Sequence, residues 1–476
     1  MVFNSLVFIV FAAVFFSILY ILRRSARLQI RWGFLVLASF FFYGWWDWRF
    51  LFLILASGLI DYFGALGIRR FPRHRKLFLI LSLLGNVGSL AVFKYSGFIA
   101  GNLDALLAMA GMETSLAERV PDFMLILPVG ISFYTFQSMS YTIDVYRGEL
   151  KPTKNILHFF AYLSLFPQLV AGPIVRARDL LPQLRRLRPT NNLERWNGFK
   201  LIMIGYFKKV VLADNIAPLV NSGFANIHLT DNTQFWWVVI IGFAFQIYFD
   251  FSGYSDIARG LAKWMGLHFR LNFNHPYHSR SLREFWTRWH ISLSTWFRDF
   301  VYIPMGGSRK GRWNAHLFMW ITMVISGLWH GSAWTFITWG ALHAFYISLE
   351  RITRWPSHLK KLPGGILLSI IITNILVLIG WVFFRAEGIT DAFQIIGNMF
   401  SFAGNGDFVM NKEIRNGIIW IVVSLLIELV TYFRFKPHLL MPPRYRRLAD
   451  MIYVLILLLS CIYLRGEGNV FIYFQF

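Results

Sequence analysis

The stretch Ser326-Gly-Leu-Trp329-His330-Gly331-Ser-Ala-Trp334 lies inside an apolar run that extends from residue 315 to residue 338. A helix that crosses a bilayer needs about 20 apolar residues, so this run predicts a membrane span with His330 near the bilayer centre. Ionisable side chains at that depth are costly and usually functional. Imidazole is also well suited to proton transfer near neutral pH. The stretch therefore predicts a membrane protein with buried proton chemistry.

The rest of the chain shares this apolar character. Of its 476 residues, 56% are hydrophobic and 15% are charged, whereas a soluble domain has about 45–50% apolar and about 25% charged residues. Apolar stretches continue from residue 5 to the C-terminus, so we expect one all-α, polytopic integral-membrane domain over residues 1–476. The first stretch has no basic leader and no cleavage site, which predicts a span rather than a signal peptide. The candidate spans are 5–22, 30–47, 49–68, 77–95, 122–146, 196–213, 234–262, 315–338, 340–353, 364–384, 416–433 and 449–464. Because several are short or charged, we expect about 9–12 transmembrane helices.

The charge of the chain is strongly positive, with a formal net charge of +23. The basic residues cluster in short loops between apolar stretches, which is the positive-inside pattern. Placing the loops 23–27 and 69–76 in the cytoplasm puts the N-terminus outside. We expect these loops to contact anionic membrane lipids. We expect no nucleic-acid binding, because no recognised nucleic-acid module is present.

Two segments do not fit a simple span. Segment 155–174 has basic loops at both ends and contains Pro167, Gly172 and Pro173, which break helices. We therefore expect it to be re-entrant, a geometry tolerated only inside protein or beside a water-filled cavity. Segment 267–313 is moderately apolar and rich in Arg and Trp. It predicts a cytoplasmic or half-inserted layer of helices that leads toward His330.

His330 is the first candidate catalytic residue. Trp329 and Trp334 give it apolar walls, and Gly331 permits close approach of a substrate or of another backbone. A neutral imidazole there can accept a proton from a hydroxyl group, which makes that oxygen a nucleophile toward a thioester. The alternative is a core histidine that hydrogen-bonds between helices.

His290 is the second candidate, within Trp286-Thr-Arg288-Trp289-His290. Helical spacing would place Trp286 next to His290, with the aromatic edge beside a polar one. Such a surface could bind the phosphates and adenine of a cofactor or position a donor thioester. The alternative is an interfacial amphipathic helix whose Trp and Arg side chains act as anchors.

Two carboxylates, Asp250 and Asp256, lie inside an apolar stretch and need partners. Asp256 can pair with Arg259 on one helix face, and we expect Asp250 to reach a distant Arg, a His or a helix terminus. Structural ion pairing is favoured over a catalytic acid pair. His275 and His278 have a spacing that could hold a metal, but no further ligands at a recognised spacing complete a site. We therefore expect no metal.

Several motifs are similar to those of the membrane-bound O-acyltransferase (MBOAT) family. The chain most resembles the bacterial branch that acts in alginate O-acetylation and in D-alanyl transfer to teichoic acids. The matching stretches are Leu127–Tyr134, Phe166–Pro173, Gln246–Asp256, Glu284–Trp296, Gly327–Gly331 and Phe471–Phe476. The resemblance implies a ring of membrane helices, with re-entrant segments, around a central tunnel. The family's hallmark histidine maps onto His330, and its second characteristic histidine maps onto His290.

The resemblance also implies a reaction. Cytoplasmic acetyl-CoA would donate an acetyl group that crosses the bacterial inner membrane to an extracytoplasmic acyltransferase partner. That partner would acetylate a cell-envelope or extracellular polysaccharide, such as alginate or peptidoglycan. The residues expected to bind the donor or line the tunnel are Trp286, Arg288, Trp289, Trp329, Trp334, Asp250 and Asp256. Two other functions remain open: a transporter with a histidine proton relay, and an acyltransferase that acts on a lipid or a protein.

Overall fold

The computed structural model describes residues 1–25, 27–169, 172–402, 412–433 and 443–472. Over these residues the chain is helical and contains no β-strand, which confirms the all-α prediction. The chain divides into two compact units. The first comprises residues 1–202 and 257–270, and the second comprises residues 203–256 and 271–476. The single membrane domain and the central tunnel expected above stay predictions.

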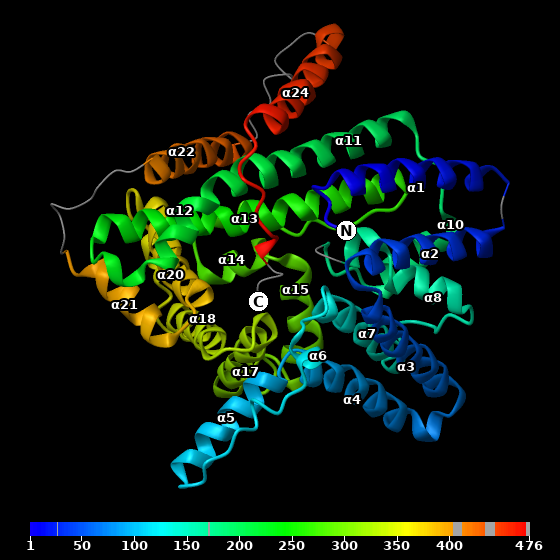
Figure 1. Cartoon of the computed structure of the whole chain (residues 1–476), viewed down its shortest axis with the longest axis horizontal. Coiled ribbons are helices and arrows are strands. Elements are labelled where there is room, and N and C mark those ends of the chain that lie inside the picture. The colour runs from blue at the N-terminus through cyan, green and yellow to red at the C-terminus, as the bar shows by residue number, and fades with distance from the viewer. Residues whose placement is uncertain (26, 170–171, 403–411, 434–442, 473–476) are drawn as a thin grey trace. The chain divides into compact units, whose positions relative to one another are not determined.

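The first unit is built mainly from the N-terminal helices (Figure 1). These are α1 (Leu6–Ser25), α2 (Leu28–Asp47), α3 (Leu51–Arg70), α4 (Arg75–Phe93), α5 (Ser96–Met109), α6 (Asp122–Leu125), α7 (Ile131–Tyr146), α8 (Ile156–Leu163), α9 (Phe166–Leu169), α10 (Ala177–Arg186) and most of α11 (Asn192–Tyr206). The expected span 122–146 is wrong, because α6 ends at Leu125 and α7 begins only at Ile131. Helix α5 follows α4 after a short break and was not among the expected spans.

A buried carboxylate joins three helices of this unit. Asp61 on α3 is fully buried and accepts hydrogen bonds from Ser82 on α4 and from Ser138 and Thr142 on α7. Asn86 on α4 donates a fourth hydrogen bond, of 2.8 Å. A buried charged group needs such partners, so this network ties α3, α4 and α7 together.

The expected break within segment 155–174 is confirmed. Helix α8 begins after Asn155, whose side chain caps it by accepting from the backbone N–H of His158 at 3.0 Å. The helix ends at Leu163, and the short α9 follows at Phe166. Residues 170 and 171 of this segment lie outside the described residues. Whether the segment re-enters a membrane stays a prediction.

The second unit holds the remaining helices and the two histidines. They are α12 (Asp214–Ala225), most of α13 (Thr233–Trp264), α14 (Leu282–Arg288), α15 (Ile291–Phe297), α16 (Ile303–Met305), α17 (Arg312–His330), α18 (Trp334–Thr353), α19 (Trp355–Leu359), α20 (Gly365–Arg385), α21 (Ile389–Phe400), α22 (Lys412–Tyr432) and α24 (Pro443–Tyr463). Two π-helical turns, Phe207–Ala213 and Arg298–Tyr302, precede α12 and α16. Segment 267–313 thus contains short helices, as expected.

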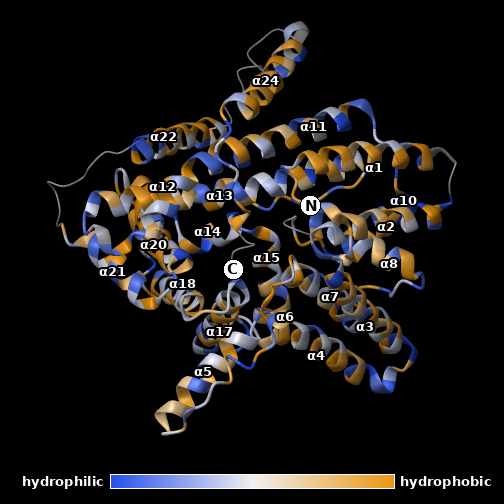
Figure 2. Ribbon diagram, viewed as in Figure 1, coloured by the Kyte–Doolittle hydropathy of each residue, from blue (hydrophilic) through white to orange (hydrophobic). Residues whose placement is uncertain are grey.

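Six helical stretches among the described residues are long and apolar enough to cross a membrane. They are Leu6–Arg23, Leu28–Arg70, Pro72–Phe93, Thr233–Trp264, Gly365–Arg385 and Lys412–Tyr432. The second comprises both α2 and α3. Figure 2 shows the apolar residues along these helices in orange. The sequence-based count of spans is higher, because it includes shorter and more polar stretches.

The structure corrects the span around His330. Helix α17 ends at His330, and α18 begins at Trp334, so the expected continuous span 315–338 is wrong, whereas the expected stretch 340–353 lies within α18. The two helices approach closely where Gly327 lies opposite Phe336 and Gly340 lies opposite Met323. A Cβ on Gly327 would lie 2.2 Å from the Phe336 carbonyl oxygen, and one on Gly340 would lie 2.4 Å from that of Met323. The hydrophobic pattern did not reveal the break between α17 and α18, because the sequence on both sides of it is apolar. His330 therefore lies at a helix end rather than in mid-helix.

Candidate active site

His330 is buried in an aromatic setting at the C-terminal end of α17. Its exposed fraction is 4%. The ring centroid lies 4.9 Å from that of Trp329, 5.1 Å from that of Trp339 on α18 and 5.2 Å from that of Phe384 on α20. The low dielectric of such a site strengthens every electrostatic interaction within it. The arrangement suits a neutral imidazole that accepts a proton.

His290 lies in a sharp turn between α14 and α15. Its φ is +40°, a left-handed conformation that is uncommon for a residue other than glycine and often marks a functional site. Asn272, which is fully buried, holds this turn. The Asn272 carbonyl oxygen accepts from the Ile291 N–H at 2.9 Å, and its side-chain oxygen accepts from the Ser292 N–H at 3.1 Å.

This turn makes the expected continuous helix wrong, because α14 ends at Arg288. The imidazole of His290 packs edge-on against Phe251, with centroids 4.6 Å apart, and its exposed fraction is 1%. Burial lowers the pKa of His290 to about 3, so this imidazole is neutral at physiological pH. Its ring lies 6.3 Å from that of Trp329. Trp329 therefore contacts both histidines and brings the two motifs together.

The other expected site residues differ in their contacts and exposure. Trp286 contacts Trp339 at 5.7 Å rather than lying over His290, and Trp289 is buried against Trp381 at 4.9 Å. Arg288 pairs with Glu284 on its own helix at 2.7 Å. Trp334 is 53% exposed. Trp286 and Trp329 thus lie in the aromatic surroundings of His330, whereas Arg288 is held by a local ion pair.

The two acids serve ion pairs. Asp256 pairs with Lys208 at 2.7 Å. Asp250 pairs with Lys209 at 2.8 Å, and Lys209 also pairs with Asp214 at 2.8 Å. The expectation of an Arg, a His or a helix terminus for Asp250 is therefore wrong, since its partner is a lysine on the preceding π-helical turn.

This buried group also binds the end of the chain. Asp250 Oδ2 accepts from the Ile472 N–H at 2.8 Å, and Lys209 Nζ donates to the Asn469 carbonyl oxygen at 3.0 Å. Phe471 then packs against Tyr254, with ring centroids 4.4 Å apart. The last four residues of the C-terminal motif, 473–476, lie outside the described residues.

His275 and His278 both lie near one carboxylate, that of Glu428. His275 Nδ1 lies 2.8 Å from Glu428 Oε2, and His278 Nε2 lies 3.9 Å from the same oxygen. Burial lowers the pKa of His278. Among the described residues no group of three or more His, Cys, Asp or Glu side chains could hold a metal ion. The absence of a metal stays a prediction.

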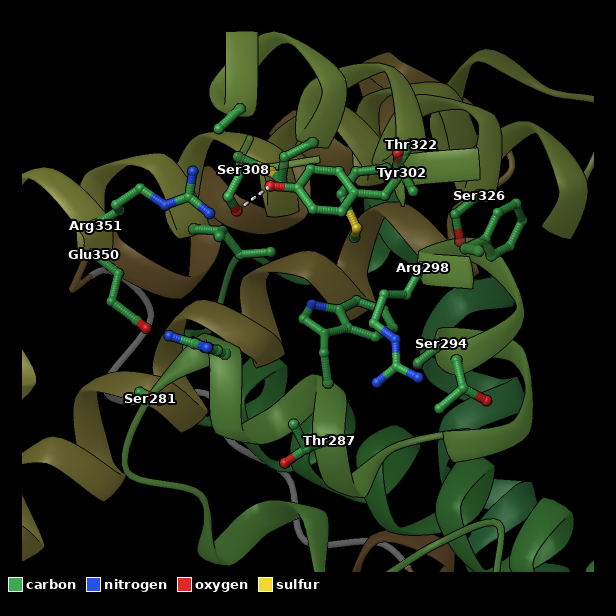
Figure 3. A pocket seen from close by; sticks show the side chains of 18 of the residues that line it. Ser281, Thr287, Ser294, Arg298, Tyr302, Ser308, Thr322, Ser326, Glu350 and Arg351 are labelled. Carbon is green, nitrogen blue, oxygen red and sulfur yellow. Dashed lines mark hydrogen bonds between the residues drawn. The ribbon is translucent and has the colours of Figure 1, made fainter. Parts of the chain in front are cut away.

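A cavity of about 1160 Å³ opens beside these elements. Figure 3 shows Arg351 and Glu350 at one side of it and Arg298, Ser294 and Ser326 at the other. The arginines that line it are Arg283, Arg298, Arg312, Arg351 and Arg354. Apolar side chains, including Met319, Met323 and Ile347, form the rest of the wall. Such a cavity suits a large anionic ligand with an apolar end, because arginine binds phosphate groups with paired N–H donors.

The cavity approaches the candidate base closely. Ser326, which lines it, lies one helical turn before His330 on α17. Trp286 also lines it and contacts Trp339, which in turn contacts His330. Trp286 therefore connects the wall of the cavity to the aromatic residues around His330.

Sequence reasoning missed three features of this site. The arginines of the cavity come from four elements and from the cap of α19, so no local pattern brings them together. Asn272 gave no signal beyond its place in a loop. His343 on α18 is fully buried and contacts Trp339 at 4.9 Å. A histidine inside an expected apolar span could have pointed to it, by the same reasoning that singled out His330.

Comparison with known proteins identifies the family of this chain. Residues 149–387 match the model of MBOAT, the membrane-bound O-acyltransferase family. The chain belongs to this family. The MBOAT match includes both His290 and His330, and it makes this multi-pass membrane protein an O-acyltransferase.

Relatives span most of the chain. It is 38% identical over 434 residues to the probable alginate O-acetylase AlgI of Pseudomonas putida, and this match covers 90% of the chain and 85% of that protein. It is 34% identical over 408 residues to the peptidoglycan O-acetyltransferase of Helicobacter pylori, covering 80% and 75%. It is 31% identical over 229 residues to the teichoic acid D-alanyltransferase of Streptococcus thermophilus, covering 45% and 54%.

Proposed function

We propose that this protein is an O-acetyltransferase that takes an acetyl group from cytoplasmic acetyl-CoA and serves the acetylation of a cell-envelope or extracellular polysaccharide. Relatives named for alginate and peptidoglycan O-acetylation support the acetyl group and the kind of acceptor. The observation that carries the proposal is the arginine-lined cavity, whose lining includes Ser326, one helical turn before His330 on α17.

The cavity suits the donor on two grounds. Its arginines match the phosphate groups of coenzyme A, and its apolar wall matches the less polar end that carries the thioester. Arg288, which we expected to hold the donor, is replaced in this role by the lining arginines, among them Arg298 and Arg351.

His330 acts as the base in this mechanism. Its neutral imidazole takes the proton of the acceptor hydroxyl as that oxygen attacks the thioester carbonyl carbon. When the carbon–sulfur bond breaks, the imidazolium returns the proton to the departing thiolate. His290, held in its strained turn and linked to His330 through Trp329, positions the aromatic wall of the site.

The remaining parts of the proposal concern the cell. The protein lies in the bacterial inner membrane with its N-terminus outside, an orientation that the distribution of its basic loops supports. An extracytoplasmic acyltransferase partner completes the transfer to the polysaccharide.

The test compares two histidines of one helix. A deletion strain is complemented with wild type, His330→Ala or His316→Ala at matched membrane expression, and ester-linked acetate is measured in each envelope polysaccharide fraction. His316 is the matched control, since it lies on α17 and contacts Ser348, at 3.2 Å, instead of the site. We expect His330→Ala to lose about 100-fold or more of the acetate and His316→Ala to retain it. Full acetylation by His330→Ala would refute the assignment and favour a transporter.

A further inference from the structure

An aromatic group beside His330 contains several buried polar atoms. It comprises Trp286 on α14, Trp339 and His343 on α18, and Trp381 on α20. Trp339 and Trp381 are each 1% exposed, and His343 is fully buried. The indole nitrogens of the three tryptophans and both ring nitrogens of His343 have no hydrogen-bond partner within the part of the chain that the structure describes.

Such an arrangement is costly. A buried polar group left unsatisfied costs about 1–3 kcal/mol, and an apolar side chain of similar shape would avoid that cost. Several unsatisfied groups in one cluster therefore call for an explanation. Because Trp286 lines the cavity, a polar atom of a ligand that meets one of these donors during the reaction would explain part of this cost.

Trp339 is the member best placed to meet that atom. Its ring lies 5.1 Å from the His330 ring and 5.7 Å from the ring of Trp286, which lines the cavity. Trp381 instead packs against Trp289, at 4.9 Å, and stacks behind Trp339 at 6.3 Å. Trp339 thus stands between the cavity wall and the base.

The surroundings also fix the orientation of Trp339. His343, one turn further along α18, contacts it at 4.9 Å. Across from His343, α20 has a glycine: a Cβ on Gly380 would lie 2.8 Å from His343 Nε2. Phe384 contacts Trp339 at 5.4 Å. A donor held in this way costs no reorganisation when charge develops.

We propose that the indole N–H of Trp339 donates a hydrogen bond to the acyl carbonyl oxygen during transfer at His330. This inference rests on the proposed function. As the acceptor oxygen forms its bond to the carbonyl carbon, the carbonyl π electrons move onto the carbonyl oxygen, which becomes negatively charged. The Trp339 N–H stabilises that charge until the carbon–sulfur bond breaks and the carbonyl re-forms. No further reactant is required.

The test uses two matched tryptophans. Trp339→Phe and Trp381→Phe each remove an indole N–H and keep an aromatic ring, and both N–H groups are buried and unsatisfied among the described residues. Membrane vesicles that hold the native acceptor receive radiolabelled acetyl-CoA, and initial rates are normalised to folded protein. We expect Trp339→Phe to lower kcat about 100–1,000-fold with little change in the KM for acetyl-CoA, and Trp381→Phe to stay near wild type.

A second variant separates the N–H from the packing. Trp339→His restores an N–H donor in a smaller ring, so we expect its kcat to exceed that of Trp339→Phe. Equal losses in both variants, or a rise in KM alone, would overturn the inference. Wild-type kcat in Trp339→Phe with inactive His330→Ala would also overturn it and leave the proposed function intact. Full activity of His330→Ala would instead refute the proposed function.

Discussion

Replacing Lys209 by methionine removes a buried positive charge from between two buried carboxylates. Lys209 Nζ lies 2.8 Å from Asp214 Oδ1 and 2.8 Å from Asp250 Oδ1, and the exposed fractions of the three side chains are 1%, 2% and 4%. The same ammonium donates to the Asn469 carbonyl oxygen. The substitution therefore leaves two uncompensated carboxylates and loosens the seat of the C-terminal segment.

The magnitude follows from opposing electrostatic effects. Two unit charges about 4 Å apart attract with about 4 kcal/mol at an effective dielectric constant of about 20. Desolvation of each buried ion opposes this attraction by several kcal/mol. Breaking a buried pair by removing one partner typically costs about 3–5 kcal/mol, and we expect Lys209→Met to lower the free energy of unfolding by that amount. Lys208→Met is the control, since the Lys208 side chain is 21% exposed and pairs with Asp256, at 2.7 Å.

The assay is denaturant unfolding of the purified protein in a fixed detergent, with Asp250→Asn and the double variant completing a cycle. Because removing the second charge relieves the first loss, the double variant should be more stable than the sum of the two single losses predicts. A Lys209→Met loss no larger than that of Lys208→Met, together with additive losses in the cycle, would refute the buried ion group as the anchor of this segment.

Three further predictions concern the helix crossing, the turn and the cavity. Gly327→Ala should sharply reduce the folded fraction on size exclusion, because its Cβ would meet the Phe336 carbonyl at 2.2 Å, whereas Gly88→Ala, which has open space, should fold normally. Burial lowers the folded-state pKa of His290 to about 3. Below about pH 6.5 the unfolded chain therefore protonates this histidine while the folded chain does not, so the free energy of unfolding decreases as the pH falls. Between pH 8 and pH 5, the free energy of unfolding measured with denaturant should therefore fall by about 2 kcal/mol less in His290→Gln than in wild type. Equal pH dependence of this free energy in both proteins would contradict the prediction. Arg351→Ala should raise the KM for acetyl-CoA about 10–100-fold without lowering kcat, and the loop variant Arg309→Ala should leave KM unchanged; an unchanged KM in Arg351→Ala would argue against donor binding in the cavity.

Local sequence patterns predicted those features that depend on composition and on short segments. The apolar runs indicated a helical membrane protein, and most expected spans coincide with helices within a few residues, such as α13 and α20. Proline and glycine in segment 155–174 indicated its break. The motifs around His290 and His330 identified the family without any knowledge of their spatial relation.

The tertiary structure decided everything that depends on contacts between distant residues. The sequence by itself determined that this is a membrane O-acyltransferase with two buried histidines, because hydropathy and motifs are properties of neighbouring residues. Only the fold ends α17 at His330, places His343 and Trp339 beside it, and gathers arginines from several helices around one cavity. Helical spacing failed at His290 because Asn272, about 20 residues away, stabilises a turn there, and hydrogen bonds over such separations leave no periodic trace in the sequence.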